Sequence, residues 1–208
     1  APGQPAIVVE CNETTLAIDK SITGSLQVVD TSEIQISESI VDAGEVSGSA
    51  ISGPGGNDPS GKLTAERVTI IGKVRTRMME LVTNSIIKAE RATGDTWEAP
   101  VIADRVQQGC IRFSYIPPGS KTPSPYQCVP ANQENDSFVQ PVFESLQYND
   151  KSYCQLSEKT SKKITEGAED YSEMGVFHDL YQPQRIKNLQ NRIREYLKFG
   201  LEEGVFLV

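Results

Sequence analysis

The stretch LAIDKSITGSL, residues 16–26, contains two features that recur along the first half of the chain. Its first four residues alternate between apolar and polar side chains, which is typical of a strand with one buried face. A Ser-Ile step follows at residues 21–22, and Ser-Ile or Thr-Ile steps recur at residues 39–40, 69–70 and 85–86. The segment SITGSL at residues 21–26 also resembles TIIGKV at residues 69–74, with Gly24 matching Gly72.

These repeats predict a short single-stranded parallel β-helix, or β-solenoid. The steps lie 18, 30 and 16 residues apart, and the long interval contains a Gly/Ser/Pro-rich segment, residues 44–62, which we interpret as an exposed loop insert. Without the insert, strands recur about every 20 residues, the period of a solenoid whose coils stack like residues on one another. SIVDA at residues 39–43 also resembles SIIKA at residues 85–89. An antiparallel sandwich is the alternative, and a solenoid is right-handed by default.

The chain therefore divides into solenoid repeats at residues 1–92 and a second part, residues 93–208, that caps them. The second part contains a connector, a proline-rich wrap and a C-terminal helix. Prolines at positions 117, 118, 123 and 125 argue against regular strand pairing there. Residues 138–156 are expected to lie along the flank of the solenoid as an irregular clamp. A short helix is expected at residues 157–166, with Ser157 as N-cap and Gly167 as its stop.

The last predicted element is an amphipathic helix at residues 184–203, with Pro183 near its start. Its apolar residues share one face at a spacing of 3.6 residues: Ile186, Leu189, Ile193, Tyr196, Leu197 and Leu201. The apolar tail at residues 205–208 is expected to dock either on its own domain or on a neighbouring subunit, because an exposed apolar tail is a liability.

Composition restricts the class of partner. The 208 residues have a net charge of −8, with 38% hydrophobic and 23% charged residues, which indicates a globular chain. The negative charge argues against a nucleic-acid backbone or an anionic membrane as the main partner. The sequence shows no apolar run long enough to span a bilayer and no signal peptide, so direct membrane insertion is not expected. Because the chain begins at Ala1 without a methionine, we suspect a fragment or a processed product.

The four cysteines, Cys11, Cys110, Cys128 and Cys154, form no CxxC pair. A metal site from the last three with His178 is conceivable, but their spacing matches no zinc finger. We favour buried or half-buried thiols in a reducing compartment, and a Cys110–Cys128 disulfide remains open in an oxidising medium. No metal or cofactor is therefore expected.

Acidic residues gather near the only histidine. Glu166, Glu169, Asp170 and Glu173 precede His178, and carboxylates with a histidine can bind a divalent ion or act as acid and base. Their spacing matches no calcium loop, and such groups are common on surfaces. We therefore predict no catalytic residue in this cluster.

The candidate contact residues all lie outside the predicted repeats, residues 1–92. The only tryptophan is either an interface anchor or packs over the edge of the core, and the arginine of CIRFSYI is either an anion-binding or a solvated strand residue. The candidates for protein–protein contact are Trp97, Arg112, Tyr115, Tyr126, Phe206 and Leu207.

Three long segments carry a family resemblance: QQGCIRFSYIPPGSKTP, VQPVFESLQYNDKSYCQL and EGAEDYSEMGVFHDLYQPQRIKNLQNRIREYLKFGLEEGVF. With the repeats, they resemble the C-terminal region of a family of large, mostly uncharacterised bacterial proteins. The genes of that family lie among contractile, phage-tail-like clusters, and some members begin with a phage tail protein I-like segment. Lys121 and Ser124 stand where the family pattern has arginines, so anion binding by that loop is not expected here.

The resemblance implies a structural, non-catalytic component of the baseplate or tail of a contractile injection system. Its partners would be other subunits of the particle and a second copy of itself, assembled in the bacterial cytoplasm and later released or membrane-associated with the particle. The alternative is a tail-spike-like β-helix that binds or cleaves polysaccharide, for which Asp19, Glu38 and Glu66 supply carboxylates near the strands. An effector released by the particle is a third possibility.

Overall fold

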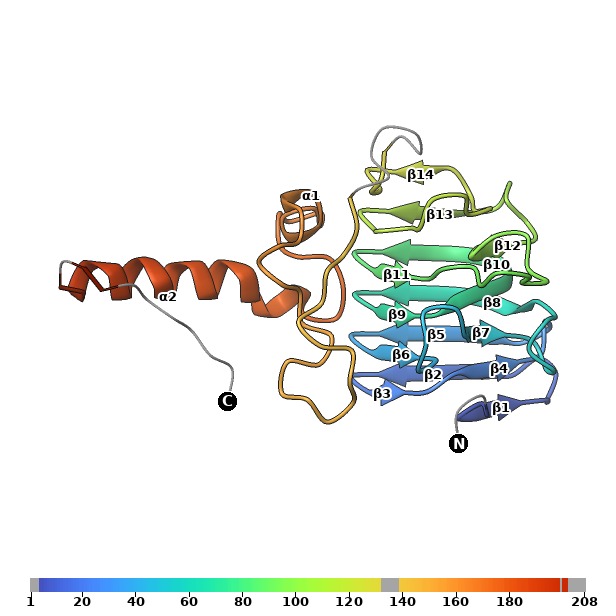
Figure 1. The fold of residues 1–208 in the computed structure, drawn as a ribbon. Helices are drawn as coiled ribbons and strands as arrows, with labels where there is room; N and C mark the ends of the chain where they lie inside the picture. Colours follow the sequence, from blue (N-terminus) through green and yellow to red (C-terminus); the bar gives the residue numbers. More distant parts are fainter. Residues whose placement is uncertain (1–3, 132–138, 199, 202–208) are drawn as a thin grey trace.

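The computed structural model describes residues 4–131, 139–198 and 200–201. Most of the chain forms short parallel strands arranged in three rows (Figure 1). The first row contains β2 (Thr15–Asp19), β5 (Glu33–Ser37), β8 (Ser60–Glu66), the second half of β10 (Lys73–Thr83), β13 (Gly109–Arg112) and β14 (Pro125–Tyr126). The second contains β3 (Ile22–Thr23), β6 (Ile40–Asp42), β9 (Thr69–Ile71) and β11 (Ile86–Lys88).

The third row contains β1 (Ile7–Val9), β4 (Leu26–Val28), β7 (Ser49–Ser52), the first half of β10 and β12 (Val101–Ala103). The chain visits the rows in turn, so each strand pairs with one from the next pass. All strand pairs among the described residues are parallel, so the antiparallel sandwich is wrong. The prediction of a mainly β chain with a C-terminal helix is confirmed.

The recurring serine step marks the corner between the first and second rows. Each pass has one residue there in the left-handed region, with φ between 44° and 53°: Lys20, Glu38, Arg67, Asn84, Phe113 and Gln127. The next residue is a serine in four of these six passes. Ser85 shows why, because its hydroxyl donates to the Thr83 carbonyl at 2.8 Å and accepts the Val68 N–H at 3.1 Å. The serine thus satisfies two backbone groups that the corner removes from the ladders.

Strand register corrects the repeat alignment. SIVDA and SIIKA are in register, as predicted, because Ile40 and Ile86 both align with Thr69. Thr69 therefore occupies the place of the isoleucine, and Val68 takes the place of the serine. The match of Gly24 to Gly72 is likewise wrong by one residue, because Ile22 also aligns with Ile40 and hence with Thr69.

The strand pairing also continues beyond residue 92, the predicted end of the repeats. Strand β13 pairs with β10, β14 pairs with β13, and isolated bridges join Ile86 to Tyr115 and Tyr115 to Val129. The prolines do not prevent this because Pro125 lies at the outer edge of its row, where a missing N–H is tolerated. The predicted loop insert, residues 44–62, is also only partly a loop, since it contains β7 and the start of β8.

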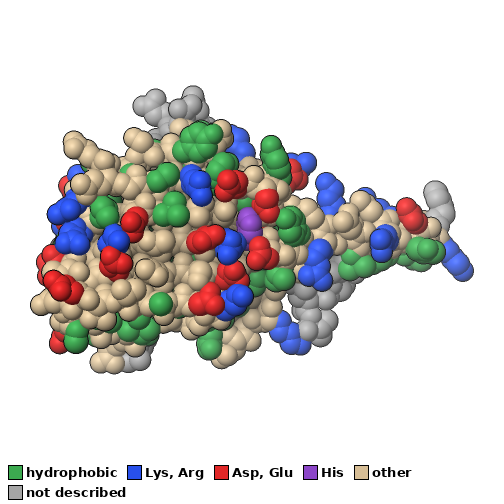
Figure 2. Space-filling view, turned by 180° about the vertical axis from the view of Figure 1, so that it is seen from behind, with side chains coloured by type: hydrophobic (Ala, Val, Ile, Leu, Met, Phe, Trp, Pro, Cys, Tyr) green, Lys and Arg blue, Asp and Glu red, His purple; other side chains and the backbone are tan. Residues whose placement is uncertain are grey.

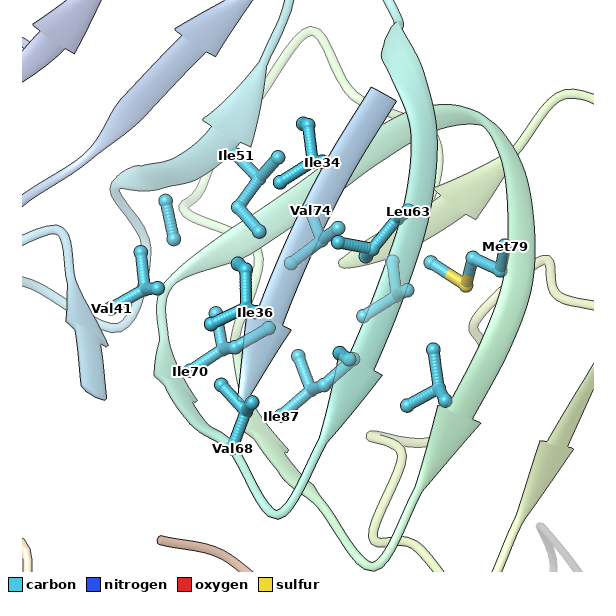
Figure 3. Close-up of a cluster of buried hydrophobic side chains, with 14 of the residues drawn as sticks. Ile34, Ile36, Val41, Ile51, Leu63, Val68, Ile70, Val74, Met79 and Ile87 are labelled. Carbon is cyan, nitrogen blue, oxygen red and sulfur yellow. The ribbon is translucent and has the colours of Figure 1, made fainter. Parts of the chain in front are cut away.

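Inward side chains form columns between the rows (Figure 3). One column of the first row shares a single register position, with the members Ile18, Ile36, Ala65, Val82 and Ile111. Like residues stack on like residues, as the repeat pattern predicts, and each pass covers the apolar face of the one before it.

Residues 139–181, which we call the wrap, pack along the second row, as expected of a clamp (Figure 1). Phe143 contacts two apolar clusters on that row, and the Tyr153 hydroxyl donates to Asp42. Helix α1 (Lys162–Thr165) is shorter than predicted, and its N-cap is Ser161 rather than the buried Ser157. The other elements here are the 3₁₀ helix η1 (His178–Leu180) and helix α2 (Gln182–Tyr196).

Helix α2 projects away from the strands (Figure 1) and none of its residues is buried. The prediction that it caps the stack is therefore wrong, since it leaves the flank beside the second row and covers neither end. It ends at Tyr196, before the predicted residue 203, which lies outside the described residues together with the tail at residues 205–208. Among the described residues, no helix is long and apolar enough to cross a membrane.

Candidate functional site

A groove of about 600 Å³ lies where the wrap meets the first strands of the second row. This volume falls within the range of small-ligand sites. Its apolar wall includes the exposed side chains of Ile22, Tyr148 and Leu180. Its charged groups are Lys20, Glu38, Asp150, Lys151 and Asp179.

The aromatic wall of the groove is fixed from behind. Tyr148 is 66% exposed and meets Tyr153 edge to face, with ring centroids 5.8 Å apart. Tyr153 is buried and bonded to Asp42, and burial together with that bond raises its pKa. Nearby, the amide of Gln155 donates to the Lys151 carbonyl at 3.1 Å, while its buried Oε1 has no partner. The groove therefore offers one exposed aromatic ring on a fixed support.

The three carboxylates suggested for a sugar-cleaving site are already engaged in other contacts. Glu38 pairs with Arg67 at 2.8 Å and with Lys20 at 3.5 Å. Glu66 pairs with the same arginine at 2.7 Å, and Asp19 accepts a hydrogen bond from Ser37 at 2.6 Å. This arrangement matches the interpretation as a solvated ridge, because all three carboxylates are already bonded to cations or a hydroxyl.

A polar cluster of Asp170, Ser172, Glu173 and His178 lies at the root of α2, and all of its members except Asp170 are buried. Figure 2 shows the single histidine among acidic and basic side chains beside the projecting helix. The Ser172 hydroxyl donates to Asp170 Oδ1 at 2.6 Å. His178 Nδ1 lies 3.1 Å from the Glu173 carbonyl, which can only accept, so Nδ1 carries a proton. Nδ1 also lies 2.8 Å from Ser172 Oγ.

This arrangement does not activate the serine as a nucleophile. In a Ser-His-Asp triad the imidazole accepts the serine proton and the aspartate orients the imidazole. Here the serine proton points to Asp170, the imidazole donates toward the serine, and Ser172 has no exposed surface. The cluster therefore fits a structural role.

The two carboxyls of the cluster differ in environment. Burial would raise the pKa of Asp170, but hydrogen bonds from Ser172 and Tyr181 outweigh it and lower the pKa to about 2. Burial raises the pKa of Glu173 to about 7, opposed only by the backbone N–H of Gln182 at 3.4 Å. Since Tyr181 and Gln182 begin α2, both carboxyls hold the root of the helix.

Of the four predicted acids, Asp170 reaches His178 with its carboxylate, at 3.5 Å, and Glu173 contacts the ring only through its backbone carbonyl. Glu166 pairs with Lys162 at 3.9 Å and Glu169 with Arg112 at 3.9 Å. The sequence analysis missed Ser172, although its position two residues after Asp170 is the spacing of a side-chain-capped turn. No group of three or more potential metal-binding side chains occurs among residues 4–131, 139–198 and 200–201.

The candidate contact residues do not form one patch. Trp97 is buried against Ala99 and Ile102, and its Nε1 donates to Asn57 at 3.2 Å, so it packs over a core edge. Tyr115 is buried beneath the wrap. Arg112 and Tyr126 are neighbours on β13 and β14, and Tyr126 is 60% exposed. Phe206 and Leu207 lie outside the described residues.

All four cysteines are free thiols. Cys11 and Cys110 are exposed, whereas Cys128 and Cys154 are buried. Burial raises the pKa of Cys128 to about 11 and that of Cys154 to about 12, so both stay protonated and unreactive at neutral pH.

The exposed face of α2 is the other feature available for binding. Leu189 is 47% and Tyr196 is 87% exposed, and Figure 2 shows hydrophobic side chains along one side of the projecting helix. The root of the helix rests on the wrap through polar groups on another side, where Gln184 donates to the Thr165 carbonyl at 3.1 Å and Gln190 donates to Glu158 at 2.8 Å. These polar contacts therefore do not cover the apolar side, on which Leu189 and Tyr196 stay exposed.

No protein-family model matches the chain, and neither a curated protein nor a solved structure matches it.

Proposed function

We propose that this chain is a structural, non-catalytic module of a contractile, phage-tail-like injection system that acts through contacts with neighbouring subunits. The observation that carries the proposal is helix α2, which is fixed at its root yet buries none of its residues. An amphipathic helix in water gains its stability mainly by packing its apolar face. A helix held away from its own core is thus suited to docking on another subunit. The family resemblance of the wrap and helix supplies the kind of assembly.

We also propose that the three rows form a β-solenoid. Parallel pairing throughout, one left-handed corner residue per pass and columns of stacked apolar side chains support this interpretation. Such a stack provides a rigid body from which the wrap and α2 can be presented.

The test is sedimentation of lysate from producing cells in which the chain carries a tag. A particle component is expected to run with the heavy, tail-like particles and to remain there at high salt. A tag found only in the light fractions would refute the proposal and favour an effector or a free binding protein. A Leu189→Asp variant tests the part that α2 plays in this experiment. Its matched control is Leu180→Asp, which places the same charge on an exposed leucine outside α2.

The groove supports polysaccharide binding as a second candidate function. An exposed ring on a rigid support is suited to stacking on a sugar. A glycan screen with wild type and Tyr148→Ala would test it. Equal binding by the two proteins, or no binding by either, would remove this candidate. Cleavage is not proposed, because Asp19, Glu38 and Glu66 are held in other contacts.

A further inference from the structure

The apolar residues of α2 follow a heptad. Ile186, Leu189, Ile193 and Tyr196 are spaced by three, four and three residues, which places isoleucine at both a positions and leucine and tyrosine at the d positions. β-Branched residues at a with leucine at d favour a two-stranded coiled coil. The helix spans 15 residues, about two heptads, and a helix of that length is marginal in water without a partner. The stripe therefore has the geometry to pair with one further helix.

The charges beside the stripe are basic. Residues 182–198 contain five lysine or arginine residues and one glutamate, although the whole chain has a net charge of −8. Arg185 and Arg192 occupy the g positions that flank the stripe. Neither forms an ion pair with another described residue. In a coiled coil, g residues meet the e residues of the partner helix, so these arginines would pair best with acidic side chains at the e positions of the partner.

A second copy of the chain does not provide those acids. In a parallel pair of α2 helices, Arg185 would face Gln190, and Arg192 would face Leu197. Two helices with an excess of positive charge would also repel each other. A partner with acidic flanks is therefore favoured over self-association.

The stripe also differs from a membrane-binding face. Interfacial helices carry a broad apolar face with tryptophan, phenylalanine or leucine. From Gln182 to Tyr196 there is no tryptophan or phenylalanine, and the apolar residues keep to the a and d positions. The polar contacts of Gln184 and Gln190 with the wrap leave Leu189 and Tyr196 exposed and Ile186 and Ile193 half-buried, so a partner helix can approach the stripe from its Leu189 and Tyr196 side.

We propose that α2 pairs with an acidic amphipathic helix of another subunit, with Ile186, Leu189, Ile193 and Tyr196 in the seam and Arg185 and Arg192 paired to acids of the partner. This inference rests on the proposed function and names the chemistry of the neighbour. It makes α2 the recognition element and the stack of strands its support.

The experiment uses the full chain and a synthetic three-heptad peptide with isoleucine at a, leucine at d and glutamate at e and g. Binding is followed by chemical-shift changes in the ¹⁵N-labelled chain. We expect saturable changes confined to α2 that weaken as salt is raised. Leu189→Asp should reduce the affinity about tenfold or more, whereas Asn191→Asp, which adds the same charge on another side of the helix, should not.

A charge exchange sharpens the test. The double variant Arg185→Glu, Arg192→Glu should no longer bind the glutamate peptide and should bind a matched peptide with lysine at e and g. Circular dichroism of each variant checks that the fold is kept.

Three results would overturn the inference. They are failure of the wild type to bind the glutamate peptide, a dimer in analytical ultracentrifugation that Leu189→Asp dissociates, and binding of α2 to phosphatidylglycerol vesicles in preference to the peptide. None of them decides the sedimentation experiment, so an error about the partner helix and an error about the particle can be told apart.

Discussion

Replacing Glu173 by glutamine should remove most of the pH dependence of stability that originates at the root of α2. Glu173 is 1% exposed, and its carboxylate receives one hydrogen bond, from the Gln182 N–H. Burial of a carboxylate with one donor disfavours its charged form. Glutamine keeps an oxygen to accept that bond and carries no charge at any pH.

The magnitude follows from the pKa. Burial raises the pKa of Glu173 from 4.5 to about 7, which corresponds to about 3 kcal/mol at about 1.4 kcal/mol per pH unit. Since the folded-state pKa lies above the unfolded value, the unfolded chain loses this proton first. Stability is therefore highest below about pH 4.5 and falls as the pH rises to about 7. Burying the extra amide N–H groups of glutamine costs about 1 kcal/mol or more, so the net gain at pH 8 is about 2 kcal/mol or less.

The assay is urea unfolding at pH 5 and pH 8 for the wild type and for the variant. Other ionisable groups are the same in both proteins, so the difference between the two proteins reports Glu173. We expect the stability advantage of Glu173→Gln to grow by about 2.5 kcal/mol from pH 5 to pH 8, because part of the effect is already present at pH 5. Glu169→Gln, at a carboxylate that is 55% exposed, is the control and should show little change. A constant difference between wild type and Glu173→Gln at the two pH values would refute the reasoning.

Two further substitutions test the corner and the wrap. Ser85→Ala leaves the buried Val68 N–H without an acceptor and should lower the free energy of unfolding by about 1–3 kcal/mol. Ser21→Ala, at the exposed equivalent position, should change it by less than about 0.5 kcal/mol. Equal effects of the two substitutions in urea unfolding would contradict the role given to the serine. Tyr153→Phe leaves Asp42 without its hydroxyl donor and should loosen the wrap, seen as faster hydrogen exchange in residues 143–156, and unchanged exchange would show that apolar packing alone holds it.

The sequence predicted the parallel strands because stacking imposes like residues at like positions. The Ser-Ile step and the alternation before it are the visible traces of the corner and of the inward column. The repeat alignment was wrong by one residue at Thr69 for a physical reason. Val68 fills the corner position without a hydroxyl, and the Thr-Ile pair that follows it resembles the Ser-Ile step. The later passes were missed for a similar reason, since Ser114 is followed by Tyr115 and Cys128 by Val129.

The buried cluster was only half predictable. Acids near a histidine are visible in any sequence, but which of them turn inward depends on the wrap. The Asp170 carboxylate meets His178 and the Glu173 side chain is buried against the Gln182 N–H, whereas Glu166 and Glu169 meet cations on the surface. The groove could not be predicted, because Lys20 and Tyr148 are more than one hundred residues apart and the wrap alone brings them together.

Helix α2 shows what an amphipathic sequence pattern can and cannot predict. The period of Ile186, Leu189 and Ile193 identifies which side of the helix requires cover, and the prediction of a helix here is confirmed. It does not identify what provides the cover, and the expectation that the strands would do so is wrong. The first residues of the helix are instead held by Asp170 and Glu173, which fix its root without using the stripe. A fold that anchors a helix by polar bonds while leaving Leu189 and Tyr196 exposed suits the contact with another subunit that we propose, and the acidic-helix experiment tests this contact.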